Sequence, residues 1–281
     1  MTKHIFREYD IRGVAERDLT SEVVERIGRG IAELLGRHVG RAPRLAVGRD
    51  CRLSGPRIHA ALTKGLQAGG AQLLDIGVGP TPALYFGVHH LETDGGVMIT
   101  GSHNAAPDNG FKIMIGHGSF FGGAIQELRA LVEGPALPDK PGGSITATPI
   151  DDAYVATLTR GIKLGRKVKV VLDAGNGGGG PLGLKALAAM GITPTALYCD
   201  MDGNFPNHHP DPTVPENLTA LVERVRAEKA DIGLAFDGDA DRLGVVDENG
   251  EIIWGDRLLA LFAGPIVAAK PGATIIGDVK C

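Results

Sequence analysis

Three aspartates stand at alternate positions within FDGDADR, at residues 236–242. Apolar segments before and after them predict a tight turn between two strands. Three carboxylates within a few ångströms repel one another strongly, and a divalent cation with oxygen ligands removes that cost. The pattern predicts a metal site at Asp237, Asp239 and Asp241. The alternative is a solvated acidic turn.

The same spacing matches part of a calcium-binding EF-hand loop. The three aspartates would occupy its positions one, three and five, and Glu248 would occupy position twelve. That loop requires glycine at position six, where this chain has Arg242, and the flanking segments are predicted strands, not helices. We therefore reject an EF-hand. Three protein ligands leave room for a phosphate oxygen, which is typical of magnesium.

A second candidate for chemistry is Ser102, within TGSHNAAPDNGFK at residues 100–112. The segment contains neither GxSxG nor a P-loop. Serine is a poor nucleophile unless another group activates it, and His103 and Lys112 are near enough in sequence to carry protons or positive charge. From the residues alone, a catalytic loop and an Asn/Asp/Gly-rich surface loop remain alternatives.

Two further motifs have competing interpretations. GNGGGG at residues 175–180 matches GxGxxG between a predicted strand and a predicted helix, and Asp200 lies near the distance expected of a ribose-binding acid. The alternative is a close strand-to-helix turn, with Pro181 at the first helical position. His208 and His209 suggest a metal site, but prolines stiffen their loop, and adjacent histidines of an extended chain rarely point the same way.

Alternating strands and helices with short connections must position these loops. Helices are predicted at 20–35, 54–69, 79–91, 125–132, 151–162, 182–190 and 215–226. Strands are predicted at 44–50, 72–78, 96–99, 111–115, 167–173, 195–198, 231–236 and 243–247. This alternation is typical of α/β domains with mainly parallel sheets, whose ligand loops follow the carboxyl ends of strands. Residues 5–13 are predicted to be extended and to end in a turn.

The predicted domains are residues 1–147 with the serine loop, residues 148–250 with the aspartates, and residues 251–281 as the start of a third. Residues 134–149 are rich in Pro, Gly and small polar residues and predict a linker. The third segment is predicted to hold a short strand, a helix at 256–268 and a strand at 273–279. Two strands and a helix cannot form an independent core, so we expect the sequence to end inside that domain.

The composition of the chain argues against several classes of protein. The formal net charge of −4 over 281 residues argues against a general nucleic-acid binder. The three cysteines, Cys51, Cys199 and Cys281, are widely spaced and lack a CxxC pair, which favours a reducing cytoplasm over a disulfide framework or a zinc-thiolate site. No signal-peptide core or membrane-spanning apolar run is visible.

Taken together, the motifs resemble the α-D-phosphohexomutases, in particular their phosphomannomutase/phosphoglucomutase branch. The resemblance rests on FREYDIRG at 6–13, TGSHNAAPDNGFK at 100–112, DGNFPNHHPDPTVPENL at 202–218, DGDADR at 237–242 and GDVKC at 277–281. These segments span the chain in the family's order. The related phosphoglucosamine mutases typically begin closer to FGTDGIRG, so FREYDIRG favours the hexose branch.

The resemblance implies a phosphoglucomutase-like fold of tandem α/β domains with mixed, mainly parallel sheets. It implies that Ser102 carries the phosphoryl group, and that Mg²⁺ is held by the three aspartates together with a phosphate oxygen on Ser102. It further implies roles around this centre. His103 and Lys112 would be general acids and bases, Arg242 would balance phosphate charge, Arg12 and Tyr9 would face the active site, and Lys280 would contact substrate.

The implied reaction moves phosphate reversibly between C1 and C6 of mannose or glucose phosphates, through phosphoserine and a hexose 1,6-bisphosphate that is both intermediate and activator. A phosphoserine carries about −1.5 to −2 charges, so one dication among three aspartates leaves the cluster anionic and in need of Arg and Lys. The implied partners are small hexose phosphates, with no nucleic acid, membrane or protein partner.

Two family motifs are missing from the sequence: the GEMSGH-like sugar loop of the third domain and the phosphate-gripping loop of the fourth. These 281 residues are therefore expected to be at most weakly active alone. Two alternatives stay open. One is a phosphoglucosamine mutase that uses the same serine and aspartates. The other is a non-catalytic sugar-phosphate or dinucleotide-binding module built on the 175–180 turn.

Overall fold

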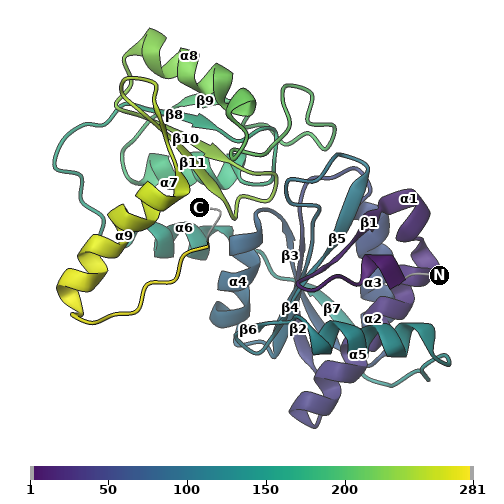
Figure 1. Cartoon of the computed structure of the whole chain (residues 1–281). Helices are drawn as coiled ribbons and strands as arrows, with labels where there is room; N and C mark the ends of the chain where they lie inside the picture. The colour runs from purple at the N-terminus through teal and green to yellow at the C-terminus, as the bar shows by residue number, and fades with distance from the viewer. Residues whose placement is uncertain (1–2, 279–281) are drawn as a thin grey trace.

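The computed structural model describes residues 3–278, which form two α/β units followed by a C-terminal helix (Figure 1). The first unit has a seven-stranded sheet in the order β1-β5-β4-β2-β3-β7, with β6 paired to β5. Its strands are β1 (Ile11–Val14), β2 (Arg44–Arg49), β3 (Gln72–Val78), β4 (Gly95–Ile99), β5 (Asp108–Ile115), β6 (Gly118–Ser119) and β7 (Ser144–Ala147). Its helices are η1 (Lys3–Ile5), α1 (Ala15–Asp18), α2 (Ser21–Val39), α3 (Gly55–Ala68), α4 (Thr81–His90) and α5 (Gly123–Glu133).

Helices cover both faces of this sheet. On one face α2 packs against α3 and α5, and its apolar stripe enters the main core. The other face is covered by α4, whose Leu84 and Val88 pack against Met98 of β4. The predicted helix at 20–35 is capped by Thr20 but continues to Val39, because Gly40 in the left-handed region (φ 71°) provides the stop.

The second unit has a five-stranded sheet in the order β12-β11-β10-β8-β9. Its strands are β8 (Val170–Asp173), β9 (Thr195–Leu197), β10 (Ile232–Phe236), β11 (Leu243–Asp247) and β12 (Ile252–Ile253). Its helices are α6 (Asp151–Thr159), α7 (Gly180–Ala189), η2 (Pro215–Leu218) and α8 (Thr219–Glu228). Leu221 and Val225 of α8 pack on one face and Leu187 of α7 packs on the other.

The two sheets repeat one topology, as the alternation of elements predicted. The order β3-β2-β4-β5 in the first unit corresponds to β9-β8-β10-β11 in the second, with parallel pairs followed by an antiparallel one. The Ser102 loop joins β4 to β5, and the aspartate loop joins β10 to β11. The two loops that carry the candidate chemistry are therefore equivalent positions of a repeated fold.

The sheets are mixed, as predicted, but parallel pairs do not outnumber antiparallel ones within residues 3–278. The predicted linker at 134–149 contains β7, which pairs in parallel with β3. Its side chains are exposed, so its sequence lacks the apolar alternation of a half-buried strand. Residues 5–13 are not continuously extended, because η1 comes first and β1 starts only at Ile11.

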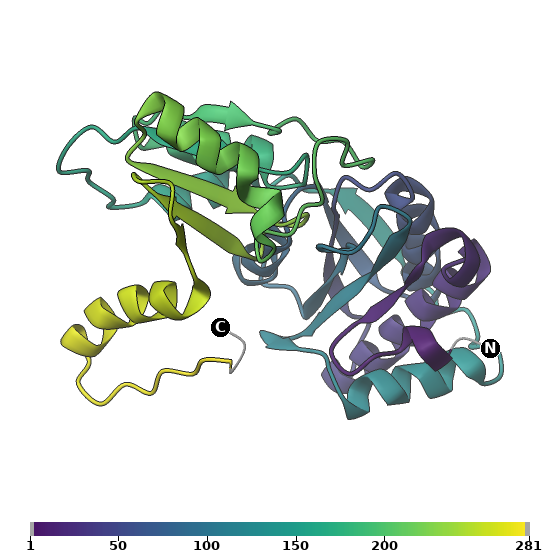
Figure 2. The ribbon, with the colours of Figure 1, turned by 45° about the horizontal axis from the view of Figure 1, so that its top comes forward.

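The segment after residue 250 differs most from the prediction. The short strand, β12, pairs with β11 and so extends the second sheet instead of starting a third unit. The helix follows as α9 (Gly255–Ala269), but residues 273–278 form no strand, since they pair with no other strand within residues 3–278. In Figure 2, α9 projects away from both units, and the chain after it turns back toward them, so that Asp278 lines the same cleft as Arg242.

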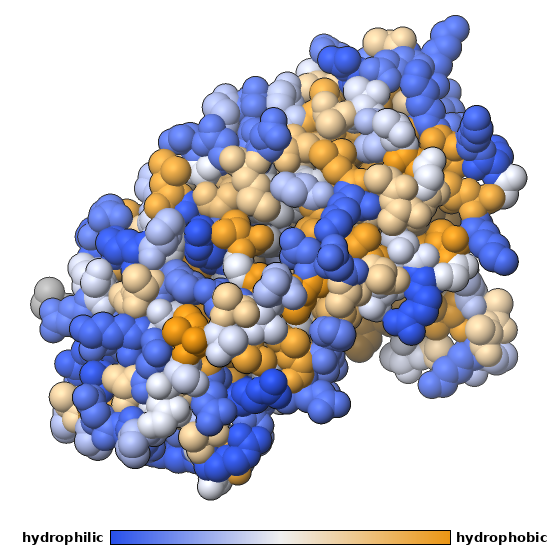
Figure 3. Space-filling view, turned by 180° about the vertical axis from the view of Figure 1, so that it is seen from behind, coloured by the Kyte–Doolittle hydropathy of each residue, from blue (hydrophilic) through white to orange (hydrophobic). Residues whose placement is uncertain are grey.

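Several large apolar side chains of α9 are exposed, namely Leu261, Phe262, Ile266 and Val267. Seen from behind, the surface is mostly hydrophilic, with hydrophobic residues gathered in patches across its middle and over the second unit (Figure 3). Among the described residues, no helix has the length and apolar character needed to cross a bilayer.

Candidate active site

The serine loop and the aspartate loop meet where the two units face each other. The Ser102 hydroxyl, only 2% exposed, donates a hydrogen bond of 2.9 Å to Oδ2 of Asp237. Both loops also hold a non-glycine residue in the left-handed region, Ser102 at φ 49° and Ala240 at φ 55°. Such strained residues persist only where surrounding contacts hold them, and they cluster at functional sites. This burial rules out an ordinary surface loop.

The three aspartates form a cluster that one cation could bridge. One carboxylate oxygen from each can be chosen so that all lie within 4.8 Å of one another, and this is the only such cluster within residues 3–278. Asp237 and Asp239 are fully buried, which excludes a solvated acidic turn. Oδ1 of Asp239 is buried without a hydrogen-bond partner. An orphaned carboxylate oxygen between two other carboxylates fits a metal ligand.

The other oxygen of Asp239 is held by three donors, which fixes the direction of the free one. Oδ2 of Asp239 accepts from the hydroxyls of Thr81 and Thr100 and, at 2.6 Å, from the ammonium of Lys112. Oδ1 of Asp237 accepts from the backbone amides of Asp241 and residue 242, both at 3.0 Å. Such second contacts orient ligands and tune a metal site.

The three clustered aspartates repel one another and need positive charge nearby in order to be ionised together. Burial, followed by repulsion from Asp239 and Asp241, raises the pKa of Asp237. Burial opposes ionisation of Asp239 too, but the ammonium of Lys112 together with hydrogen bonds from the side chains of Thr81 and Asp237 lowers that pKa. Burial acts against the charge of Lys112, yet Asp239 and Asp241 raise its pKa. Lys112 thus stabilises two of the carboxylates, and Asp237 is left without a comparable partner.

Helix α4 of the first unit supports the aspartate loop of the second. The backbone amide of Thr81, in the first turn of α4, donates to the carbonyl of Asp239 at 2.8 Å. The partial positive charge at this helix N-terminus favours nearby carboxylates. Thr81 was not predicted as a site residue. Its signal was a polar residue at the start of a helix, shortly after β3 and at the same sheet edge as the Ser102 loop.

His103 and Arg242 lie on the open side of the site. Nδ1 of His103 is 3.4 Å from the Ser102 hydroxyl, and its Nε2 is 3.5 Å from Nη1 of Arg242. Burial, then the charge of Arg242, lowers the pKa of His103. Both residues line a cleft of about 970 Å³ that Trp254 and Asp256 also line. This volume is within the range of small-ligand sites.

The two predicted site residues near the N-terminus, Arg12 and Tyr9, lie in different environments. Arg12 of β1 is buried; its Nε donates to Asp10 at 2.7 Å, and its Nη1 has no hydrogen-bond partner among the described residues. Its charge contributes to the lowered pKa of His103, which places it near the site. Tyr9 is 77% exposed and makes no contact of this kind with the described site residues. Lys280 lies outside the described residues.

Asp50 and Arg52 were not predicted as site residues either. Both follow β2, and both side chains are almost fully buried, with Nε of Arg52 donating to Asp50 at 3.2 Å. The guanidinium lies under the Ser102 loop. The only sequence signal was charge directly after a predicted strand, in RDCR at residues 49–52.

The GNGGGG segment at 175–180 forms the turn between β8 and α7, and other backbone segments pack closely on it. The amide of Gly178 donates to the carbonyl of Gly238 at 2.9 Å. A Cβ at Gly177 would lie 2.6 Å from that carbonyl oxygen, and one at Gly180 would lie 2.1 Å from the carbonyl oxygen of Cys199. These close approaches account for the glycines. The turn supports the aspartate loop, and a dinucleotide site is not favoured.

His208 is not a metal ligand. Its Nε2 lies 3.0 Å from Oδ2 of Asp173 and its Nδ1 lies 2.9 Å from the carbonyl of His209, so both ring nitrogens have protein partners. The hydrogen bond to Asp173 raises the pKa of His208.

This pair predicts a pH-dependent stability. A raised pKa in the folded state means that the added stability is fully present below the ordinary histidine pKa and is lost as pH rises through the raised value. We expect His208→Gln to lower the free energy of unfolding by on the order of 1 kcal/mol at about pH 5.5, and by less at about pH 8.5. Urea unfolding at both pH values measures this. Asp173→Asn should remove the pH dependence, and a difference that grows with pH would contradict the pairing.

Two family models match this chain. Residues 3–135 match alpha/beta/alpha domain I of phosphoglucomutase/phosphomannomutase, and residues 152–250 match domain II. The chain is 48% identical over 278 residues to a phosphomannomutase/phosphoglucomutase of Pseudomonas aeruginosa, with 99% of this chain and 59% of that protein covered. It is 47% identical over 282 residues to a phosphoglucomutase of Neisseria gonorrhoeae, with 100% of this chain and 61% of that protein covered.

A solved structure gives the same result. The crystal structure of a phosphoglucomutase/phosphomannomutase family protein from Burkholderia thailandensis superposes with a TM-score of 0.93 at 42% identity, with 100% of this chain and 62% of that one covered. The chain thus spans about three fifths of the length of these relatives. By its sequence motifs, repeated topology and both domain matches, the chain belongs to the phosphoglucomutase/phosphomannomutase family.

Proposed function

We propose that this chain carries the phosphoryl-transfer centre of a hexose phosphate mutase. The reaction is reversible transfer of phosphate between C1 and C6 of glucose or mannose phosphates, through phosphorylated Ser102 and a hexose 1,6-bisphosphate. One observation carries the proposal: the Ser102 hydroxyl lies 2.9 Å from Asp237, in a cluster of three aspartates of which Asp237 and Asp239 are buried. A serine in this place is better suited to carry a phosphate beside a metal than to act through a neighbouring base.

The metal is proposed to be Mg²⁺, held by Asp237, Asp239 and Asp241 together with a phosphate oxygen on Ser102. All of these are oxygen ligands, and Mg²⁺ in phosphoryl-transfer sites commonly combines a few carboxylates with a phosphate. When bound, the ion would neutralise charge on the carboxylates and the phosphate. The orphaned Oδ1 of Asp239 supports this assignment.

The remaining residues are proposed to manage protons and charge. His103 is placed to exchange a proton with the hydroxyl that gives or receives the phosphoryl group, because its ring nitrogen lies 3.4 Å from Ser102 Oγ. Lys112 holds positive charge between Asp239 and Asp241. Arg242 and Arg12 supply further positive charge for the phosphates, and the unpaired Nη1 of Arg12 supports this role.

Substrate recognition is proposed to occur in the cleft beside His103 and Arg242. Tyr9 and Lys280 remain proposed substrate contacts on the family resemblance alone. The domain limits are proposals as well: residues 1–147, where β7 ends the first sheet; residues 148–250, with β12 added to their sheet; and the rest of 251–281. The cytoplasm remains the expected compartment, on the spacing of the cysteines.

Incubation with a hexose 1,6-bisphosphate tests the proposal. We expect the chain to gain one phosphoryl group from glucose or mannose 1,6-bisphosphate in the presence of Mg²⁺, seen by intact mass and mapped to the peptide with Ser102. Net conversion of hexose 1-phosphate to 6-phosphate by these residues alone is expected to be weak. Absence of label with both bisphosphates, or label at another residue, would contradict the proposal.

A further inference from the structure

A fully buried arginine lies directly beneath the serine loop. The guanidinium of Arg52 donates to four backbone carbonyls of that loop: Ser102 at 2.8 Å, Asn104 at 2.7 Å, Ala105 at 2.6 Å and Asp108 at 2.9 Å. Four carbonyls that converge on one cation belong to a loop folded around it. The planar, five-donor guanidinium can serve them all at once, whereas the compact ammonium of lysine cannot.

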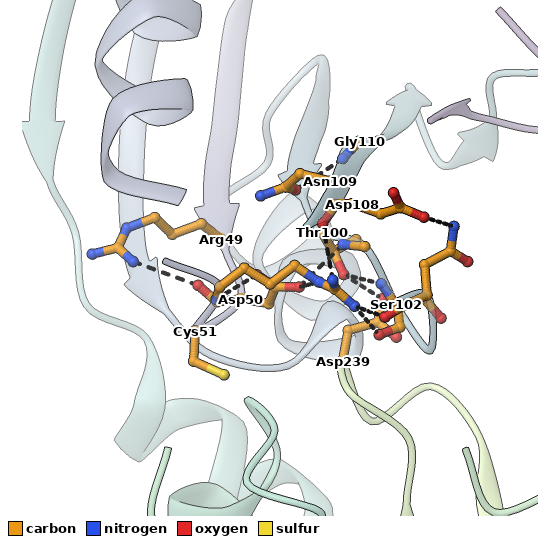
Figure 4. A network of polar contacts seen from close by, with 12 residues as sticks. Arg49, Asp50, Cys51, Thr100, Ser102, Asp108, Asn109, Gly110 and Asp239 are labelled. Atoms are coloured by element: carbon orange, nitrogen blue, oxygen red, sulfur yellow. Dashed lines mark hydrogen bonds and ion pairs between the residues drawn. The ribbon is translucent and has the colours of Figure 1, made fainter. Parts of the chain in front are cut away.

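Asp50 fixes the arginine from the other side. Its Oδ2 accepts from Nε of Arg52 at 3.2 Å and from the amide of Gly101 at 3.2 Å, so the same carboxylate touches both the arginine and the start of the serine loop. A Cβ at Gly101 would lie 2.2 Å from the guanidinium carbon of Arg52. The loop can therefore close on the arginine only because residue 101 has no side chain. Figure 4 shows this network between Asp50, Ser102 and Asp239.

The second unit completes the enclosure of Arg52. The ring of Phe205 lies 5.1 Å from the guanidinium carbon, within the range of a cation–π contact. A Cβ at Gly203 would lie 2.6 Å from the carbonyl oxygen of Cys51, so this segment presses on the loop after β2. Further along the same segment, the carbonyl of Pro210 accepts from the amide of Gly238 in the aspartate loop at 3.2 Å. Residues 203–210 thus contact the supports of both loops.

We propose that Arg52 is the positioning residue of the serine loop, and that Phe205 of the second unit holds Arg52 in place. Arg52 contacts the backbone of Ser102 and not its hydroxyl. Its role is to hold Ser102 in the left-handed conformation that directs Oγ at Asp237. The segment around Phe205 couples this conformation to the placement of the second unit. The expected effect of Arg52 on phosphoryl transfer to Ser102 rests on the proposed function, whereas its role in positioning the serine loop does not.

Two variants and a matched control test the assignment in the full chain. Arg52→Lys keeps the positive charge but removes the planar guanidinium group with its five N–H donors. Phe205→Leu removes the ring from a partly exposed site and keeps Arg52. Arg26→Lys is the control, because Arg26 of α2 also donates to a backbone carbonyl, that of Gly134 after α5, but makes no hydrogen bond to the serine loop within the described part of the chain.

The first readout is amide hydrogen exchange of residues 101–108 in the unphosphorylated protein. We expect exchange there to accelerate about tenfold or more in Arg52→Lys and about fivefold in Phe205→Leu, while β8 and α2 stay protected as in the wild type. Arg26→Lys should leave residues 101–108 unchanged. A folded Arg52→Lys protein with unchanged exchange in this loop would overturn the proposal. If Arg52→Lys does not fold, unchanged exchange in Phe205→Leu would overturn it.

The second readout is the rate of Ser102 phosphorylation by glucose 1,6-bisphosphate. A displaced hydroxyl should slow transfer at saturating bisphosphate by about 100-fold in Arg52→Lys, while the half-saturating concentration changes by less than about twofold. A general loss of folded protein would instead lower the fraction of protein that is labelled, without slowing transfer in the molecules that remain folded. If the wild type takes no label, the proposed function fails, and the exchange experiment still decides the role of Arg52.

Discussion

Replacing Ser102 with alanine is expected to abolish phosphorylation of the chain by a hexose 1,6-bisphosphate. The hydroxyl is the only group at this position that can accept a phosphoryl group, and it is buried against Asp237, so no neighbouring hydroxyl takes its place. Intact mass before and after incubation with glucose 1,6-bisphosphate and Mg²⁺ measures the effect. The wild type should gain one phosphoryl group and the variant none.

Two controls separate this loss from misfolding. Ser119→Ala changes an exposed serine of β6 in the same unit and should label like the wild type. Ser102→Gly also lacks the hydroxyl, but glycine accepts the left-handed φ of 49° without strain, so this variant should be folded and unlabelled. Phosphate on the Ser102→Ala protein at the wild-type level would show that another residue is the carrier.

Replacing Asp239 with asparagine is expected to weaken Mg²⁺ binding at least about 100-fold, with a matching loss of Mg²⁺-dependent phosphorylation. Asparagine has the same shape, but it has a single oxygen and no negative charge. That oxygen cannot both accept from Thr81, Thr100 and Lys112 and bind a cation. Calorimetric titration with Mg²⁺, followed by the labelling rate as a function of Mg²⁺, measures both effects.

Glu248→Gln is the matched control, since it also removes one carboxylate charge from the second unit. Glu248 is exposed and follows β11, whereas the aspartates precede it, and a five-residue strand separates the two ends by about 16 Å. We expect this variant to bind Mg²⁺ as the wild type does. Equal losses in Glu248→Gln and Asp239→Asn would favour an EF-hand-like site over the three-aspartate site.

Most helices and strands lie close to the ranges predicted from the sequence, because their apolar residues follow the period of a helix or a strand. The helix expected at 20–35 and the strand expected at 72–78 are examples. The prediction failed at β7, whose exposed side chains carry no such pattern, and at residues 273–278, whose apolar run pairs with no strand in the described part of the chain. A strand forms only where a neighbouring strand pairs with its backbone, and the sequence of one segment does not reveal that neighbour.

The sequence alone predicts a metal site, because the three candidate ligands fall within five residues of one turn. The role of Ser102 as a phosphate carrier follows from the family resemblance and stays a proposal, since the residues of its loop alone left a catalytic loop and a surface loop as alternatives. What holds these groups in place is visible only in the tertiary structure. Thr100 and Asp239 are 139 positions apart, and Arg52 is 50 from Ser102, yet both pairs are hydrogen-bonded and buried. Such contacts form because folding buries polar groups that must then find partners, and the partners come from distant loops at one sheet edge.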